Sequence, residues 1–275
     1  LTWTQAWGGT FDGRDGVWAT VCEDPDAATL AFGPVRRIAN GLMMNKPTVL
    51  LSGEWLFPCA IWSGEYSRPT EQHPELVAEL SGNVYVTKDS GETFQFRGGV
   101  AMPQRVFDEH MVVELNDGRL WMLVRTVYGI GQAFSRDGGR TWENVGPSGH
   151  TGPNSRFFIR RLSSGRLLLI NHVNPTNAWA DKAWKRRDNL MAMLSEDDGK
   201  TWIGGLMLDA RAPVSYPDAT QAADGRIYAI HDFDRYGARE MLMSVFTEDD
   251  VLAGQCVRPD ARLRVIVNKA TCKAD

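Results

Sequence analysis

The chain has 275 residues, of which 43% are hydrophobic and 23% charged, and its formal net charge is −4. This composition is typical of a folded globular protein and excludes the fibrous and disordered classes. The acidic balance argues against nucleic acid as a partner, because phosphate binding needs a basic surface. No apolar run approaches the roughly 18 residues of a membrane span, so no membrane-spanning segment is expected. Since the first residue is Leu1 and no signal peptide follows, we expect the natural chain to start upstream.

Hairpins recur along the chain. In each of them an apolar run, a short turn with a glycine and a second apolar run follow one another, as in two paired antiparallel strands. The four hairpins occupy residues 48–61, 112–124, 157–170 and 219–230, with turns at Ser52-Gly53, Asp117-Gly118, Ser164-Gly165 and Asp224-Gly225. No segment with helical periodicity is long enough to indicate an α/β fold.

A second motif, S/T-x-D-x-G-x-T-W/F, stands between the hairpins. It occurs at residues 87–94, 135–142 and 195–202, each time after a short strand-like run, and a degenerate copy spans residues 22–32. The residue types suit a turn, because an Asp can accept backbone N–H bonds and a Gly can adopt positive φ. We therefore expect Asp89, Asp137 and Asp197 to be structural residues in equivalent outer turns.

Hairpin and motif together make a repeating unit of four strands. We count five units, which begin near residues 1, 46, 110, 155 and 216. A repeat of this size predicts an all-β fold, a β-propeller of four-stranded antiparallel blades that forms a single domain over residues 1–275. A β-sandwich with recurrent hairpins is the alternative.

The three motif copies resemble the Asp boxes of sialidases, and their order along the chain looks like the propeller of that family. This resemblance implies six blades, of which five are visible, so an upstream strand or blade is expected. It also implies removal of a terminal sugar that carries a carboxylate beside its anomeric carbon. Such a substrate calls for arginines, for a Tyr nucleophile activated by a Glu in place of a carboxylate nucleophile, and for a separate acid.

Residues 109–118 and the arginine that follows them look like the sialidase segment that supplies the partner of the Tyr and one arginine. By this resemblance Glu109 is the general base, and Arg125 binds the substrate carboxylate through its planar fork of donors. Arg187 is similar to another arginine of the family, with Arg186 as its rival by one position. No arginine matches the first one of the family's three, which we expect upstream of Leu1.

Ser215-Tyr216-Pro217-Asp218 opens the last hairpin and resembles the nucleophile strand of sialidases, which makes Tyr216 the predicted nucleophile. We expect its hydroxyl to lie within hydrogen-bond reach of Glu109, and we expect Arg125 and Arg187 to converge without a protein carboxylate between them. The Gly-rich loop of residues 8–16 resembles the sialidase loop that carries the acid, which makes Asp12 the first candidate for the acid and Asp15 the second.

Other polar residues stand at expected strand ends, where propeller loops meet the central cleft. We assign substrate binding to Lys46 and Asn154, and a structural role to His172 and His231. The four cysteines contain no pair with zinc-site spacing, and no metal or other cofactor is predicted.

The sequence thus predicts an exo-acting, sialidase-like glycoside hydrolase that releases sialic acid or a related ulosonic acid, with a glycan as its partner. The alternatives are a polysaccharide lyase or another acidic-sugar glycosidase on the same scaffold, and a glycan-binding propeller without catalysis. A free ulosonic acid as product would distinguish the first reading from the others.

Overall fold

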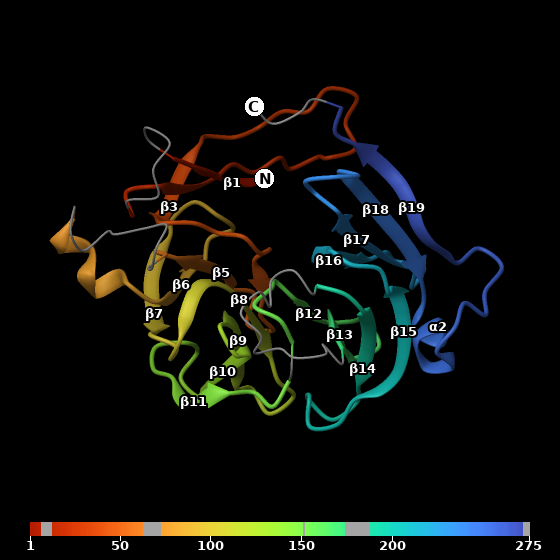
Figure 1. Ribbon diagram of the computed structural model, residues 1–275. Helices are drawn as coiled ribbons and strands as arrows, with labels where there is room; N and C mark the ends of the chain where they lie inside the picture. Colours follow the sequence, from red (N-terminus) through yellow and green to blue (C-terminus); the bar gives the residue numbers. More distant parts are fainter. Residues whose placement is uncertain (7–12, 63–72, 151, 174–186, 272–275) are drawn as a thin grey trace. The chain divides into compact units, whose positions relative to one another are not determined.

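The computed structural model describes residues 1–6, 13–62, 73–150, 152–173 and 187–271 (Figure 1). The chain divides into two compact units. The first comprises Leu1–Thr126 with Gly131–Ser148, and the second comprises Val127–Ile130 with Gly149–Asp275. Each unit is built from antiparallel sheets whose strands pair in the order in which they occur along the chain.

The first unit holds three sheets. The first sheet has three strands, β1 (Thr2–Gln5), β2 (Gly16–Ala19) and β3 (Arg36–Asn40). The second has four, β4 (Thr48–Val49), β5 (Trp55–Ala60), β6 (Gly82–Thr87) and β7 (Gln95–Val100), with the 3₁₀ helix η1 (Pro74–Glu79) between β5 and β6. The third consists of β8 (Arg105–Glu114), β9 (Leu120–Thr126), β10 (Gly129–Ser135) and β11 (Glu143–Pro147).

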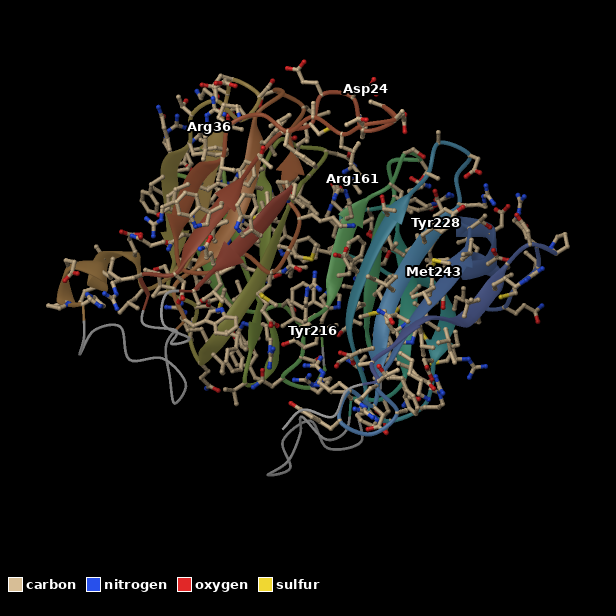
Figure 2. All side chains as sticks on the ribbon, turned by 90° about the horizontal axis from the view of Figure 1, so that it is seen from above. Asp24, Arg36, Arg161, Tyr216, Tyr228 and Met243 are labelled. Carbon is tan, nitrogen blue, oxygen red and sulfur yellow. The ribbon has the colours of Figure 1, made fainter. Side chains whose placement is uncertain are left out.

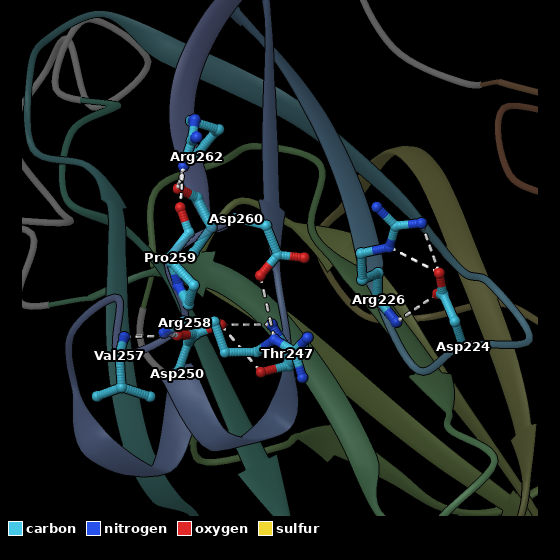
Figure 3. A network of polar contacts seen from close by, with 10 residues as sticks. Asp224, Arg226, Thr247, Asp250, Val257, Arg258, Pro259, Asp260 and Arg262 are labelled. Atoms are coloured by element: carbon cyan, nitrogen blue, oxygen red, sulfur yellow. Dashed lines mark hydrogen bonds and ion pairs between the residues drawn. The ribbon is translucent and has the colours of Figure 1, made fainter.

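The second unit holds two sheets of four strands. The fourth sheet consists of β12 (Phe158–Arg161), β13 (Leu167–His172), β14 (Leu190–Ser195) and β15 (Ile203–Asp209). The fifth consists of β16 (Val214–Gln221), β17 (Ile227–Phe233), β18 (Glu240–Phe246) and β19 (Arg262–Lys269). Between β18 and β19 the short helix α2 (Glu248–Ala253) begins with a capping box, in which Thr247 and Asp250 bond reciprocally (Figure 3).

All four predicted hairpins are present, each joining the first and second strands of a sheet. Their glycines, Gly53, Gly118, Gly165 and Gly225, have φ between 80° and 89°, a conformation that residues with a Cβ rarely adopt. Every residue of β9 and β13, the second strands of their sheets, is buried, so both faces of these two strands pack against other elements. Leu56, Val84, Val112 and Met122 belong to one core cluster that joins the second and third sheets of the first unit.

The five predicted units match five sheets, four of which have four strands. In the second, third and fourth sheets the S/T-x-D-x-G-x-T-W/F motif joins the third and fourth strands, and the degenerate copy around Asp24 joins β2 and β3. In the fifth sheet the segment that contains α2 makes this connection. The three strands of the first sheet therefore correspond to the second, third and fourth strands of the others. Among the residues described, no helix combines the length and apolarity that crossing a membrane requires.

The three motif aspartates are structural, as predicted. Asp137 accepts hydrogen bonds from Ser135 Oγ (2.8 Å), from the backbone N–H of Thr141 (2.9 Å) and from Thr141 Oγ1 (2.7 Å). Asp89 and Asp197 accept the same set from the equivalent residues. Because these bonds stabilise the charged form, they lower the pKa of all three carboxyl groups, to about 2 for Asp197.

The degenerate copy lacks most of this network. Asp24 accepts a bond from the backbone N–H of Asp26 (3.1 Å), and the aromatic residue that closes the motif, Phe32, is half exposed. In the complete copies the closing aromatic is packed: Phe94 makes an edge contact with Phe57, and Trp142 packs against the core cluster of the second and third sheets.

Candidate active site

The candidate residues share one end of their sheets. Within each four-stranded sheet the first strand begins, the second ends and the third begins at the same end, which we call the starting end. Glu109 lies in the first half of β8, Tyr216 near the start of β16, Arg125 near the end of β9, and Arg187 just before β14. The hairpin turns and the three Asp boxes lie at the opposite end, the box end. The boxes are therefore remote from the candidate residues of their own sheets.

Glu109 and Tyr216 occupy matching bulges on the first strands of the third and fifth sheets. Each stands nine residues before the glycine of its hairpin turn. In β8 the ladder passes from Asp108 to Met111, and in β16 from Ser215 to Asp218, so that two residues oppose one on the partner strand. A β-bulge of this kind re-aims a side chain.

The first residue of each bulge is in the left-handed region, with φ of 43° at Glu109 and 57° at Tyr216. A residue with a Cβ persists there only where its surroundings hold it, and such strained positions cluster at functional sites. Two sheets thus use one local device to present the two residues that the sequence predicted as catalytic.

Glu109 forms a buried ion pair with Arg125. Arg125 Nη1 donates to Glu109 Oε2 at 2.7 Å, and both residues are at most 3% exposed. The guanidinium of Arg125 also lies over the ring of Phe107, with 4.7 Å between Cζ and the ring centroid. The sequence-based expectation that the arginines have no protein carboxylate beside them is therefore wrong for Arg125. One donor of the five-donor fork is therefore engaged by Glu109.

Asn45, in the segment between β3 and β4 of the same unit, holds the Glu109 bulge. Its Nδ2 donates to the carbonyl oxygens of Glu109 (2.6 Å) and His110 (3.0 Å), and Asn45 is 4% exposed. A bulge removes backbone groups from the ladder, and buried groups of this kind need other partners. Sequence reasoning chose the adjacent Lys46 and missed Asn45, because the contact spans 64 residues of chain.

Two arginines of the second unit lie over the ring of Tyr216. The Cζ of Arg187 is 5.8 Å from the centroid of its ring, and that of Arg235 is 4.4 Å from it. Arg187 Nη2 donates to the carbonyl oxygen of Asn154 at 2.9 Å, so two predicted substrate-binding residues are in contact. Sequence reasoning missed Arg235, because it follows β17 in a loop that carries no motif.

Arg156 is a further candidate, to which sequence reasoning assigned no role. It stands nine residues before Gly165, at the position that Glu109 and Tyr216 hold in their sheets. It is 7% exposed, and its Nη2 lies 3.4 Å from Asp218 Oδ2. The nine-residue spacing between Arg156 and Gly165 is the signal in the sequence that could have identified Arg156.

The remaining predicted residues are placed as follows. Asp12 and Arg186 lie outside the described residues, whereas Asp15 is buried at 1% exposure. Lys46 precedes β4 at the starting end. Glu109 and Arg125 belong to the first unit and Tyr216 and Arg187 to the second, so the expected approach of Tyr216 to Glu109, and of the two arginines to each other, stays a prediction.

His172 and His231 are both fully buried. His231 Nε2 lies 3.3 Å from Asp209 Oδ2, and His172 Nδ1 lies 2.8 Å from the carbonyl oxygen of Asp188. This burial favours the structural role assigned to them. Within the described part of the chain, no cluster of three or more His, Cys, Asp or Glu side chains has a metal-binding arrangement.

The family described as BNR repeat-like domain matches residues 26–229, which is most of the chain. The chain belongs to this family. The match contains the three Asp boxes, Glu109, Arg125, Arg187 and Tyr216, and a comparison with curated proteins found no match.

Solved structures of sialidases share the fold of this BNR-repeat protein. It is similar to the leech intramolecular trans-sialidase, with a TM-score of 0.63 at 16% identity over 87% of the chain. It is also similar to the intramolecular trans-sialidase of Ruminococcus gnavus, with a TM-score of 0.61 at 17% identity over 90% of the chain. These likenesses, with the five successive antiparallel sheets, identify the β-propeller fold. The matches cover 37% and 52% of those two chains.

The same fold also occurs in a glycosidase of another kind. The exo-beta-1,3-galactanase of Phanerochaete chrysosporium matches 83% of this BNR-repeat chain at 9% identity, with a TM-score of 0.51, and the match covers 51% of the galactanase chain. A propeller therefore does not specify the sugar on which a member acts, and function has to be argued from the side chains.

Proposed function

We propose that the protein is an exo-acting, sialidase-like glycoside hydrolase that releases a terminal acidic sugar, sialic acid or a related ulosonic acid, from a glycan. The observation that carries the proposal is the matched pair of bulges, which places a Tyr and a Glu in strained, left-handed positions at the same point of two sheets.

In the proposed reaction, the phenol oxygen of Tyr216 attacks the anomeric carbon while the bond from that carbon to the leaving oxygen breaks. The phenol proton moves to the carboxylate of Glu109, and the leaving oxygen takes a proton from Asp12, or from Asp15. In the second step water attacks the anomeric carbon and gives a proton to the carboxylate of Asp12, or of Asp15, while the bond to Tyr216 breaks and the phenol oxygen takes its proton back from Glu109. The configuration is therefore retained.

Arginines and polar groups receive the carboxylate of the sugar in this proposal. Arg187 lies over the ring of Tyr216 and donates to the carbonyl oxygen of Asn154, while Arg125 donates to Glu109. Lys46 adds positive charge at the starting end of its sheet. Besides acting as the general base, Glu109 orients Arg125 through its carboxylate.

The test is incubation of the full chain with sialylated and other acidic-sugar glycans, with products identified by mass spectrometry. We expect a free ulosonic acid. Tyr216→Phe removes the nucleophilic oxygen and should lower kcat by at least about a thousandfold while glycan binding is kept.

An unsaturated product that absorbs in the near ultraviolet would replace the proposal with a lyase, and binding without turnover would replace it with a glycan-binding propeller. Near-normal turnover by Tyr216→Phe would refute the mechanism. Arg226→Gln is the control, since Arg226 lies in the hairpin turn at the box end of the sheet that carries Tyr216.

A further inference from the structure

Arg235 is held against Tyr216 by two neighbouring side chains. Its Nη2 donates to Ser215 Oγ (3.1 Å) and to Asp232 Oδ2, and Ser215 Oγ donates to Asp232 Oδ1 (2.7 Å). Ser215 and Asp232 oppose each other in the ladder at the last regular pair before the bulge. The three side chains thus form a closed network beside the strained residue.

The loop that carries Arg235 is itself ordered by hydrogen bonds. The carboxylate of Asp234 accepts the backbone N–H groups of Gly237 (3.1 Å) and Ala238 (2.8 Å), and the N–H of Asp234 donates to the carbonyl oxygen of Pro213 (2.9 Å). The last contact ties the loop to the residue that precedes β16. The position of Arg235 relative to Tyr216 is therefore set by the backbone as well as by Asp232.

The guanidinium of Arg235 carries its charge close to the Tyr216 phenol. Burial opposes that charge, but the carboxylate of Asp232 and, to a smaller extent, the Tyr216 side chain outweigh burial and raise the pKa of Arg235 above its ordinary value. A cation over an aromatic face is attracted to it, and the attraction grows when the ring system becomes negative.

We propose that Arg235 is a positioning residue for Tyr216: anchored by Asp232 and Ser215, it holds the phenol ring in the bulge and stabilises negative charge on the phenol oxygen. This inference deepens the proposed function, on which its catalytic part rests. It assigns a role to an arginine other than the carboxylate binders Arg125 and Arg187.

The same sheet provides a matched comparison at its box end. Arg226 Nε donates to Asp224 Oδ2 at 2.7 Å (Figure 3), and its Cζ lies 5.8 Å from the ring centroid of Tyr228. Tyr216 and Tyr228 are towards opposite ends of the sheet (Figure 2). Both tyrosines thus have an arginine that is paired to an aspartate, but Tyr228 stands in a regular strand.

The first experiment needs no substrate. Native protein is treated with an acylating or sulfonylating reagent for tyrosine, and the labelling rates of Tyr216 and Tyr228 are followed by peptide mass spectrometry. The reagent consumes phenolate, so Arg235→Gln should slow the labelling of Tyr216 about tenfold, as expected for the loss of a partly buried cation contact. Labelling of Tyr228 should not change.

Two further variants separate charge from position. Arg235→Lys keeps the charge without the planar fork and should restore part of the rate, whereas Asp232→Asn keeps Arg235 but loosens its anchor and should slow labelling of Tyr216. Arg226→Gln should leave Tyr216 unaffected. Unchanged or faster labelling of Tyr216 in both Arg235→Gln and Asp232→Asn would overturn the proposal, and thermal unfolding of each variant shows that the comparison is made on folded protein.

The second experiment uses turnover of an acidic-sugar glycan. Arg235→Gln should lower kcat with little change in KM, because the interaction with Tyr216 strengthens in the transition state. A rise in KM alone would assign Arg235 to substrate binding and overturn the positioning role. If no acidic sugar is released by the parent protein, the proposed function fails, while the labelling experiment still decides whether Arg235 acts on Tyr216.

Discussion

Asn45, just before β4, and Thr48, in β4, both donate to carbonyl oxygens of β8, but at different distances from the bulge. Asn45 bonds the carbonyls of Glu109 and His110, whereas Thr48 Oγ1 donates to the carbonyl of Val112 at 2.6 Å, past the bulge. Each contact satisfies a backbone group that water does not reach easily. Only the first of them acts on the backbone of a proposed catalytic residue.

Asn45→Ala should therefore lower both stability and activity. It leaves two buried carbonyls without their donor, at a cost of about 1–3 kcal/mol in the free energy of unfolding, and it frees the Glu109 backbone to leave the left-handed region. Thr48→Val is the matched control, with a comparable loss in denaturant unfolding but near-normal kcat per folded molecule. Equal loss of kcat in the two variants would contradict a positioning role for Asn45.

At the scale of the element, each Asp box is a rigid turn that joins the third and fourth strands at the box end. The carboxylate binds a hydroxyl and backbone N–H groups of one turn, and the closing aromatic packs into the unit. The box thus fixes how two strands are joined, and it leaves the starting end open to variation in sequence.

Asp137→Ala and Asp24→Ala should separate the complete box from the degenerate one. Loss of Asp137 removes the acceptor for several donors at once and should lower the unfolding temperature clearly, whereas Asp24 accepts a bond from Asp26 and its loss should lower that temperature less. Thermal unfolding measures both. Catalysis per folded molecule should be unchanged in Asp137→Ala, and a selective loss of turnover there would contradict a purely structural box.

At the scale of the whole molecule, buried histidines make stability depend on pH. Burial, with a smaller contribution from the charge of Arg187, lowers the pKa of His172 from 6.5 to about 4, so the unfolded chain binds a proton more readily than the folded one between these values. His172 therefore leaves stability intact above pH 6.5 and reduces it as the pH falls towards 4. The pKa values of His110 and His150 are also lowered by burial, in the same direction.

We expect the free energy of unfolding to fall by about 3 kcal/mol between pH 6.5 and 4 on account of His172 alone, from the difference between its pKa values. Denaturant unfolding at several pH values measures this slope. His172→Gln should flatten it, whatever the variant does to stability at neutral pH. An equally steep slope in that variant would show that other groups carry the pH dependence.

The sequence by itself determined the repeat: five units, glycine hairpins and Asp boxes, with Glu109, Arg125, Arg187 and Tyr216 in order along the chain. These features are local, because strand alternation and turn chemistry depend on residues a few positions apart. Glu109, Arg156 and Tyr216 each stand nine residues before the glycine of a hairpin, so their equivalence was also present in the sequence, although that spacing was not used to predict it.

Only the tertiary structure decided how these residues are held. The bulges, the pairing of Glu109 with Arg125, the support from Asn45 and the contact of Arg235 with Tyr216 depend on register and on contacts between distant segments. A one-residue change of register moves a side chain to the other face of a sheet, and no short sequence pattern predicts where such a change occurs. Residue types that bind sugars were therefore visible in the sequence, whereas the strain and charge that would make them reactive arise only on folding.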